Sequence, residues 1–314
     1  MRRTMMSVIL AGSVLLAACG DATAPGNAND DDRAEILALL GETGWFDEGF
    51  GIDGAADNAS FAVSGFNLGL TASAAGAMDT VPLTQRWGRR FLAPTERNRE
   101  VNVSGDTATV TWSVRFADGQ FLLDRTRDEQ VNPTTKPMDV TSTTTATLVR
   151  RAEQDSAGRR WALIALSPAR LVNTATDRRT VAITQVVVRV NGEVVKTIND
   201  VNRREDLAGL VDLSIGDEVS VTASVTNTTA NGNTPETFVF LHLYHASLSA
   251  RGWARIPMED NGDGTWTRSW IARHDGHQRQ MVDAIDSQTF NTDTDDDYRS
   301  EVWGVPYQIR RQGQ

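Results

Sequence analysis

The four histidines of the chain fall in two pairs with the same spacing, His242-x-x-His245 and His274-x-x-His277. Imidazole is a common metal ligand, so zinc or copper binding is the first chemistry to weigh. On a strand, residues three apart point to opposite faces, which separates His242 from His245. Only a loop could bring His274 and His277 together, so these two are the metal candidates. Hydrogen-bonded structural or surface histidines are the favoured interpretation.

An acidic turn is the second place where a cation could bind. The sequence Glu-Asp-Asn-Gly-Asp-Gly from Glu259 to Gly264 resembles the first half of an EF-hand loop, but Trp270 occupies the position of the bidentate glutamate. Asp260 and Asp263 therefore stay calcium candidates only together with the acidic run at 293–297. A tight hairpin is the favoured interpretation, and we expect no metal and no cofactor.

Tryptophan is concentrated near the C-terminus, where four of the eight in the chain lie beyond residue 252. Trp266 and Trp270 are four apart and share one face of a strand. Indole rings stack on sugars, so Trp266, Trp270 and Trp303 are candidate ligand-binding residues. Core packing is favoured, because a fold without disulfides needs large aromatic burial.

Motifs for catalysis are weak. Residues 49–54 match the G-x-G-x-x-G dinucleotide fingerprint, but a predicted helix precedes them and Asp47, Glu48 and Asp53 place negative charge where phosphates would bind. The chain has no G-x-S-x-G turn to present a nucleophilic serine. No catalytic residue is therefore assigned.

The N-terminus has the features of an export signal. Arg2 and Arg3 precede an apolar run from Val8 to Leu16, which is too short to span a bilayer permanently. The run ends in Leu-Ala-Ala-Cys, which resembles the lipobox of bacterial lipoproteins. That resemblance implies a signal peptide over residues 1–18, a diacylglycerol on Cys19 and a membrane anchor.

Two further observations bear on this anchor. Cys19 is the only cysteine, so the chain forms no internal disulfide. Gly20 in the next position is similar to lipoproteins sorted to the outer membrane, so we expect a cell-envelope protein, with its leaflet left open. Residues 19–32 are small and polar, which is typical of a flexible tether.

The charge excludes one class of partner. The net charge is −10, and removal of Arg2 and Arg3 with the signal peptide lowers it to −12. A surface of that sign repels phosphates, so nucleic acid is not an expected partner.

Residues 33–175 have the pattern of an α+β unit. Ile36, Leu37 and Leu40 predict a helix that begins near the three aspartates at 30–32, and a short helix is predicted over Thr84–Phe91. Strict alternation from Ala108 to Phe116 predicts a strand between turns at 105–106 and 118–119, and further strands are predicted at 140–149 and 161–166.

This order, including the strand Arg160–Pro168, resembles the ketosteroid-isomerase-like or polyketide-cyclase-like α+β fold over Arg33–Leu171. The catalytic equipment of that family does not carry over, because no tyrosine precedes Tyr244 and no histidine precedes His242.

Residues 176–311 are predicted to be all strand. Turn signals separate the predicted strands, and the spacing resembles an immunoglobulin-like β-sandwich whose topology stays open. The predicted strands are 181–190, 193–198, 219–225, 238–244, 265–272, 280–285 and 302–309.

Two functions remain. The first is a non-catalytic binding or scaffold role in the cell envelope, with an α+β unit and a sandwich presented to a protein or glycan partner. The alternative is an enzyme or transport accessory that acts on a small molecule or polysaccharide. Convergent carboxylates in an open pocket would favour the alternative.

Overall fold

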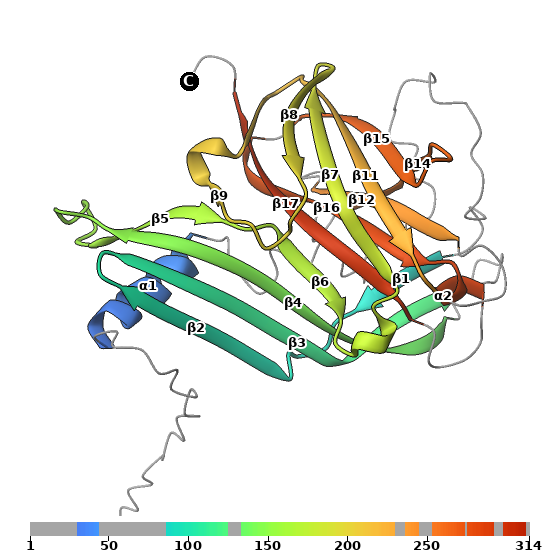
Figure 1. The fold of residues 1–314 in the computed structure, drawn as a ribbon, viewed down its shortest axis with the longest axis horizontal. Coiled ribbons are helices and arrows are strands. Elements are labelled where there is room, and N and C mark those ends of the chain that lie inside the picture. Colours follow the sequence, from blue (N-terminus) through green and yellow to red (C-terminus); the bar gives the residue numbers. More distant parts are fainter. Residues whose placement is uncertain are drawn as a thin grey trace, which may run out of the picture.

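The computed structural model describes seven segments of the chain. They are residues 30–43, 86–124, 133–229, 236–244, 253–273, 275–291 and 298–311. Strands make up 64% of these residues and helices 11%, so the prediction of a β-rich fold is confirmed. The strands form two sheets (Figure 1).

The larger sheet has twelve strands. They are β1 (Arg86–Arg90), β2 (Glu96–Ser104), β3 (Thr107–Asp124), β4 (Thr134–Arg150), β5 (Trp161–Leu166), β6 (Ala169–Asn173), β9 (Glu205–Asp206), β10 (Val211–Ser214), β12 (Thr237–Tyr244), β13 (Trp253–Pro257), β16 (Gly276–Asp286) and β17 (Ser300–Arg310). The main path runs β1-β3-β4-β6-β17-β16-β12-β13, with β2 beside β3, β5 beside β4, β9 beside β5 and β10 beside β17. Neighbouring strands are antiparallel except β10, which is parallel to β17.

The smaller sheet has five strands and packs on β16 and β17 (Figure 1). They are β7 (Val181–Val190), β8 (Glu193–Ile198), β11 (Glu218–Asn227), β14 (Glu259–Asp260) and β15 (Thr265–Ile271), in the order β14-β15-β11-β7-β8. The strands predicted over 181–190 and 193–198 are confirmed. The turn between them holds Asn191 and Gly192 at positive φ, which asparagine and glycine tolerate best.

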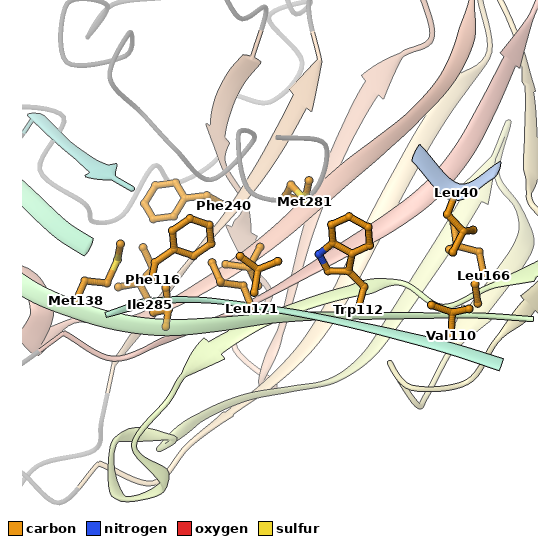
Figure 2. Packing of buried hydrophobic residues seen from close by; sticks show 14 of the residues in the cluster. Leu40, Val110, Trp112, Phe116, Met138, Leu166, Leu171, Phe240, Met281 and Ile285 are labelled. Carbon is orange, nitrogen blue, oxygen red and sulfur yellow. The ribbon is translucent and has the colours of Figure 1, made fainter. Parts of the chain in front are cut away.

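β16 and β17 form a wall between two hydrophobic cores. β16 directs Met281 into the first core and Val282 into the second. β17 likewise directs Val302 into the first core and Trp303 into the second. Figure 2 shows the first core, where side chains from both halves of the chain meet. Those labelled are Leu40, Val110, Trp112, Phe116, Met138, Leu166, Leu171, Phe240, Met281 and Ile285.

The two halves therefore share one sheet and one core. β17 pairs with β6 in a ladder from Glu301 opposite Val172 to Gly304 opposite Ala169. The boundary expected between residues 175 and 176 does not separate two sheets.

The alternation from Ala108 to Phe116 marks a strand, as predicted, and this strand extends to Asp124 as β3. The turn predicted at 118–119 is wrong. β3 continues there through a bulge, where its pairing with β4 shifts between Phe116 and Gly119. A Cβ on Gly119 would lie 2.7 Å from the carbonyl oxygen of Met138, so this close approach requires glycine.

The helix predicted over Thr84–Phe91 is also wrong, because Arg86–Arg90 form the strand β1. Trp87 and Arg89 both point into the protein, whereas Arg90 is exposed. Because the charged residue Arg89 occupies a buried position of β1, the sequence of this strand does not show the alternation of apolar and polar residues that predicts a strand.

The helix predicted near residue 30 is confirmed as α1 (Asp30–Glu42). Ile36 and Leu40 are fully buried under it. The last three residues of the expected tether, 30–32, form its first turn. The second helix, α2 (Gln288–Asn291), is a single turn after β16.

Carboxylates fix α1 to the end of the large sheet. Asp32 accepts hydrogen bonds from the Trp161 indole at 3.1 Å and from Arg150 Nη2 at 2.6 Å. Glu35 accepts from the backbone N–H groups of Arg160 and Trp161 and from Arg160 Nε. Burial opposes ionisation, but these bonds hold the pKa of both carboxyls below their usual values.

Glu35→Gln should lower the unfolding free energy by about 1–3 kcal/mol at pH 7, because it removes a carboxylate that accepts several hydrogen bonds. A lowered folded-state pKa contributes stability above the ordinary pKa, and this contribution is lost as the pH falls. The difference between wild type and variant should therefore shrink from pH 7 to about pH 4. Urea unfolding at both pH values measures it. Glu193→Gln, on an exposed edge, is the control, and an equal change in both variants would contradict the assignment.

Candidate functional site

The ends of the main path of the large sheet, β1 and β13, approach each other through side chains. Arg255 of β13 donates to the Trp87 carbonyl at 2.8 Å, and its guanidinium lies 3.5 Å from the Trp87 ring centroid. Trp87 also packs against Phe121, Phe240 and Phe290, with centroids 5.0–5.5 Å apart. The curved sheet thus closes around the first core with a side-chain contact instead of a backbone ladder.

A polar cluster lies beside this contact, and we call it the buried cluster. It consists of Arg89, His242, Asp283, Tyr298 and Ser300. Arg89 donates from Nη1 and Nη2 to the two carboxylate oxygens of Asp283 at 2.5 and 2.8 Å. Its Nε donates to the Tyr298 hydroxyl at 2.6 Å, which leaves the Tyr298 proton for Ser300 Oγ, also at 2.6 Å.

His242 joins the cluster from β12. Its Nε2 lies 3.0 Å from Asp283 Oδ2, the same oxygen that Arg89 Nη1 contacts. A histidine, a carboxylate, a tyrosine and a serine within hydrogen-bonding reach are the groups that acid–base catalysis uses. Their accessibility therefore decides what the cluster can do.

The buried cluster is closed to solvent. The exposed fraction is 0% for Arg89, Asp283 and Tyr298, and 2% for His242. Burial opposes both charges of the ion pair, but the attraction between them raises the pKa of Arg89 and lowers the pKa of Asp283. Burial also raises the pKa of Tyr298, so its hydroxyl keeps its proton. The cluster is a buried ion pair with hydrogen bonds to its neighbours, and it joins β1 to β16 and β12.

Sequence reasoning missed this cluster. Arg89 and Asp283 are 194 positions apart, and Arg89 and Tyr298 are 209 apart. The expectation that no histidine or tyrosine is available to the N-terminal unit depends on separate folding of the two halves, whereas here His242 and Tyr298 pack beside β1. No motif or spacing marks these residues, because each comes from a different strand or loop.

The histidine candidates are not brought together within the described segments. His242 is buried in the cluster and His277 is exposed. His245 and His274 lie outside the described residues. In the part of the chain that the structure covers, no three His, Cys, Asp or Glu side chains are placed to hold a metal ion.

Asp260 is the last residue of β14, and Asp263 lies in the exposed turn between β14 and β15. Asp260 accepts from the N–H of Gly262 at 2.8 Å, and Asp263 accepts from the hydroxyl and N–H of Thr265 at 2.6 and 3.0 Å. The hydrogen bond from the Thr265 hydroxyl is the main cause of the lowered pKa of Asp263. Both carboxylates therefore stabilise a hairpin, and the acidic run at 293–297 lies outside the described residues.

The tryptophan candidates belong to the second core. Trp270 and Trp303 are buried, with 7% and 3% exposed, and Trp266 packs against the same core while half-buried. The Trp303 indole donates to Glu301 Oε1 at 3.1 Å. None of the three rings forms an open platform with the others.

A small apolar pocket lies between β8, β10 and β17, with a cavity volume of about 10 Å³. Ile198, Val211 and Val305 line it, and an ion pair of 2.8 Å between Lys196 and Glu205 borders it. Sites for drug-sized ligands usually occupy about 300–1,000 Å³, whereas this pocket has room for about one water molecule.

Comparisons of the chain with protein-family models, with curated proteins and with solved structures find no match. Within the described segments, no helix has the length and apolar character needed to cross a membrane. Cys19 and the glycine-rich residues 49–54 lie outside the described residues.

Proposed function

We propose that this chain is a lipid-anchored protein of the bacterial cell envelope with a non-catalytic binding or scaffold role. The observation that carries the proposal is the sequence Leu-Ala-Ala-Cys at 16–19, after a basic and apolar N-terminus, with Cys19 the only cysteine. Outer-membrane sorting is part of the proposal, on the basis of Gly20. The partners are the membrane and an envelope protein or glycan, and not nucleic acid.

The buried cluster supports a scaffold role over catalysis. Its histidine, carboxylate and tyrosine form hydrogen bonds and an ion pair that join strands from both halves of the chain. Reacting groups need a substrate within hydrogen-bonding reach, and these groups are enclosed by aromatic side chains.

The finer fold assignments also belong to the proposal. The packing of α1 on the antiparallel strands β4 and β5 supports an α+β unit related to the ketosteroid-isomerase-like fold over 33–175. The packing of the smaller sheet on β16 and β17 supports an immunoglobulin-like sandwich over 176–311.

Cys19→Ser should move the protein from the membrane fraction to the soluble fraction of a bacterial host, because serine has no thiol to take the lipid. Ser13→Ala, in the same signal segment, should leave the protein in the membrane fraction. Fractionation and the mass of the mature N-terminus measure both variants. An unchanged distribution for Cys19→Ser, or an N-terminus without added lipid mass in the wild type, would refute the anchor.

A further inference from the structure

α1 lies at one corner of the molecule. It contacts the end of β4 and the start of β5, beside the turn at 151–160. The turn between β7 and β8 lies on the far side of the smaller sheet (Figure 1). The first described residue of the chain, Asp30, is therefore fixed close to the turn at 151–160 and remote from the turn at 191–192.

The length of chain before α1 limits the reach of an anchor at Cys19. Asp30 comes eleven residues after Cys19, which spans at most about 40 Å when fully extended. The tether expected from the sequence over these residues would have a mean end-to-end distance of about 18 Å. The corner that carries α1 must therefore stay within about 40 Å of the lipid.

The docking of α1 decides this reach. With α1 detached, the next described residue in a sheet is Arg86, which follows Cys19 by 67 residues. The upper limit then rises to about 240 Å. The hydrogen bonds of Asp32 and Glu35 with Arg150, Arg160 and the Trp161 indole hold α1 in place. They therefore decide whether the chain between Cys19 and the folded part is short or long.

We propose that α1, docked on β4 and β5, fixes the orientation of the protein on a lipid surface. We call this docked helix the clasp. The corner with α1 and the turn at 151–160 faces the membrane, and the turn between β7 and β8 faces away from it. This inference rests on the proposed anchor at Cys19. It adds which face is near the lipid and which side chains hold it there.

Attraction of arginines to anionic lipid is the other way in which this corner could be held near a membrane. Four of the arginines at this corner already contact a carboxylate: Arg150 with Asp32, Arg151 and Arg159 with Asp155, and Arg160 with Glu35. The fifth, Arg33, lies on α1 together with the acidic residues Asp30, Asp31 and Glu42. Lipid phosphates would have to displace these partners. The orientation should therefore be the same on neutral and on anionic vesicles, whereas an orientation set by charge would depend on the lipid.

The test uses the mature chain coupled through Cys19, its only thiol, to a maleimide lipid in phosphatidylcholine vesicles. This coupling makes the result independent of whether bacteria lipidate Cys19, so failure of the clasp and failure of the anchor are distinguishable. A fluorescent amino acid replaces either Ser156 or Glu193, both exposed, and a headgroup-labelled lipid quenches it. Quenching at Ser156 should exceed quenching at Glu193 roughly threefold, given the short tether. Equal quenching, or a ratio that requires anionic lipid, would overturn the proposal.

Variants of α1 identify the clasp. Asp32→Asn combined with Glu35→Gln should bring the quenching ratio close to one, whereas Asp30→Asn, on the exposed side of α1, should preserve it. A full ratio in the double variant would refute the role of these carboxylates. A second change leaves the clasp intact: about thirty Gly and Ser residues inserted after Gly26 should lower the ratio by lengthening the tether. An unchanged ratio after this insertion would also refute the proposal.

Discussion

Asp283→Asn is expected to lower the unfolding free energy by about 3–5 kcal/mol, because it leaves the buried Arg89 guanidinium without a counter-charge. Both side chains have an exposed fraction of 0%, so solvent cannot replace the lost partner. Urea unfolding at pH 7 measures the loss. A double variant, Arg89→Met with Asp283→Leu, should recover much of it, since it removes the charge together with its partner.

Asp212→Asn provides the matched control. Asp212 pairs with Arg310 at 3.0 Å, but both side chains are more than half exposed. Exposed pairs contribute little, so this variant should unfold almost as the wild type does. Equal losses for Asp212→Asn and Asp283→Asn would contradict the assignment of the buried cluster as the fastening between β1 and β16.

A fragment from Thr180 to Gln314 is expected to lack a cooperative thermal transition. In the full chain, β17 pairs with β6, and Met281, Ile285 and Val302 pack against side chains of the N-terminal half. The fragment exposes this apolar surface and leaves one edge of β17 without its partner strand. Circular dichroism during heating measures the outcome.

The sequence-based hypothesis of two units makes the opposite prediction for this fragment. Under that hypothesis the fragment melts cooperatively, at a temperature close to that of one transition of the full chain. The full chain, melted under the same conditions, is the reference. A cooperative melt of the fragment would restore the boundary near residue 176 and would mean that the shared core adds little stability.

Individual strands could be predicted because each buries a regular set of side chains. β3 from Thr107 to Phe116 and β11 from Glu218 to Val225 alternate between buried and more exposed residues, which a reader of the sequence can recognise. Their partners could not be predicted in the same way. The pairing of β6 with β17 joins Arg170 to Trp303, and nothing local in either strand marks the other.

The buried cluster was hidden for a different reason. Sequence patterns treat charged residues as exposed, and here Arg89 and Asp283 are among the most buried residues of the fold. Glu301 is a similar case. It is 1% exposed and accepts hydrogen bonds from Arg170, from the Trp303 indole and from the backbone of Ile183 in the other sheet. Such residues become interpretable only when the strands around them are known.

The position of β17 has a consequence for the order of events after synthesis. β17 is the last described strand along the chain, yet it lies inside the sheet between β6 and β16. Neither core can be completed before it emerges, and such long-range pairing makes folding slow. A chain made only as far as β16 therefore leaves the edges of β6 and β16 that face β17 without a partner strand, and both cores stay open on one side.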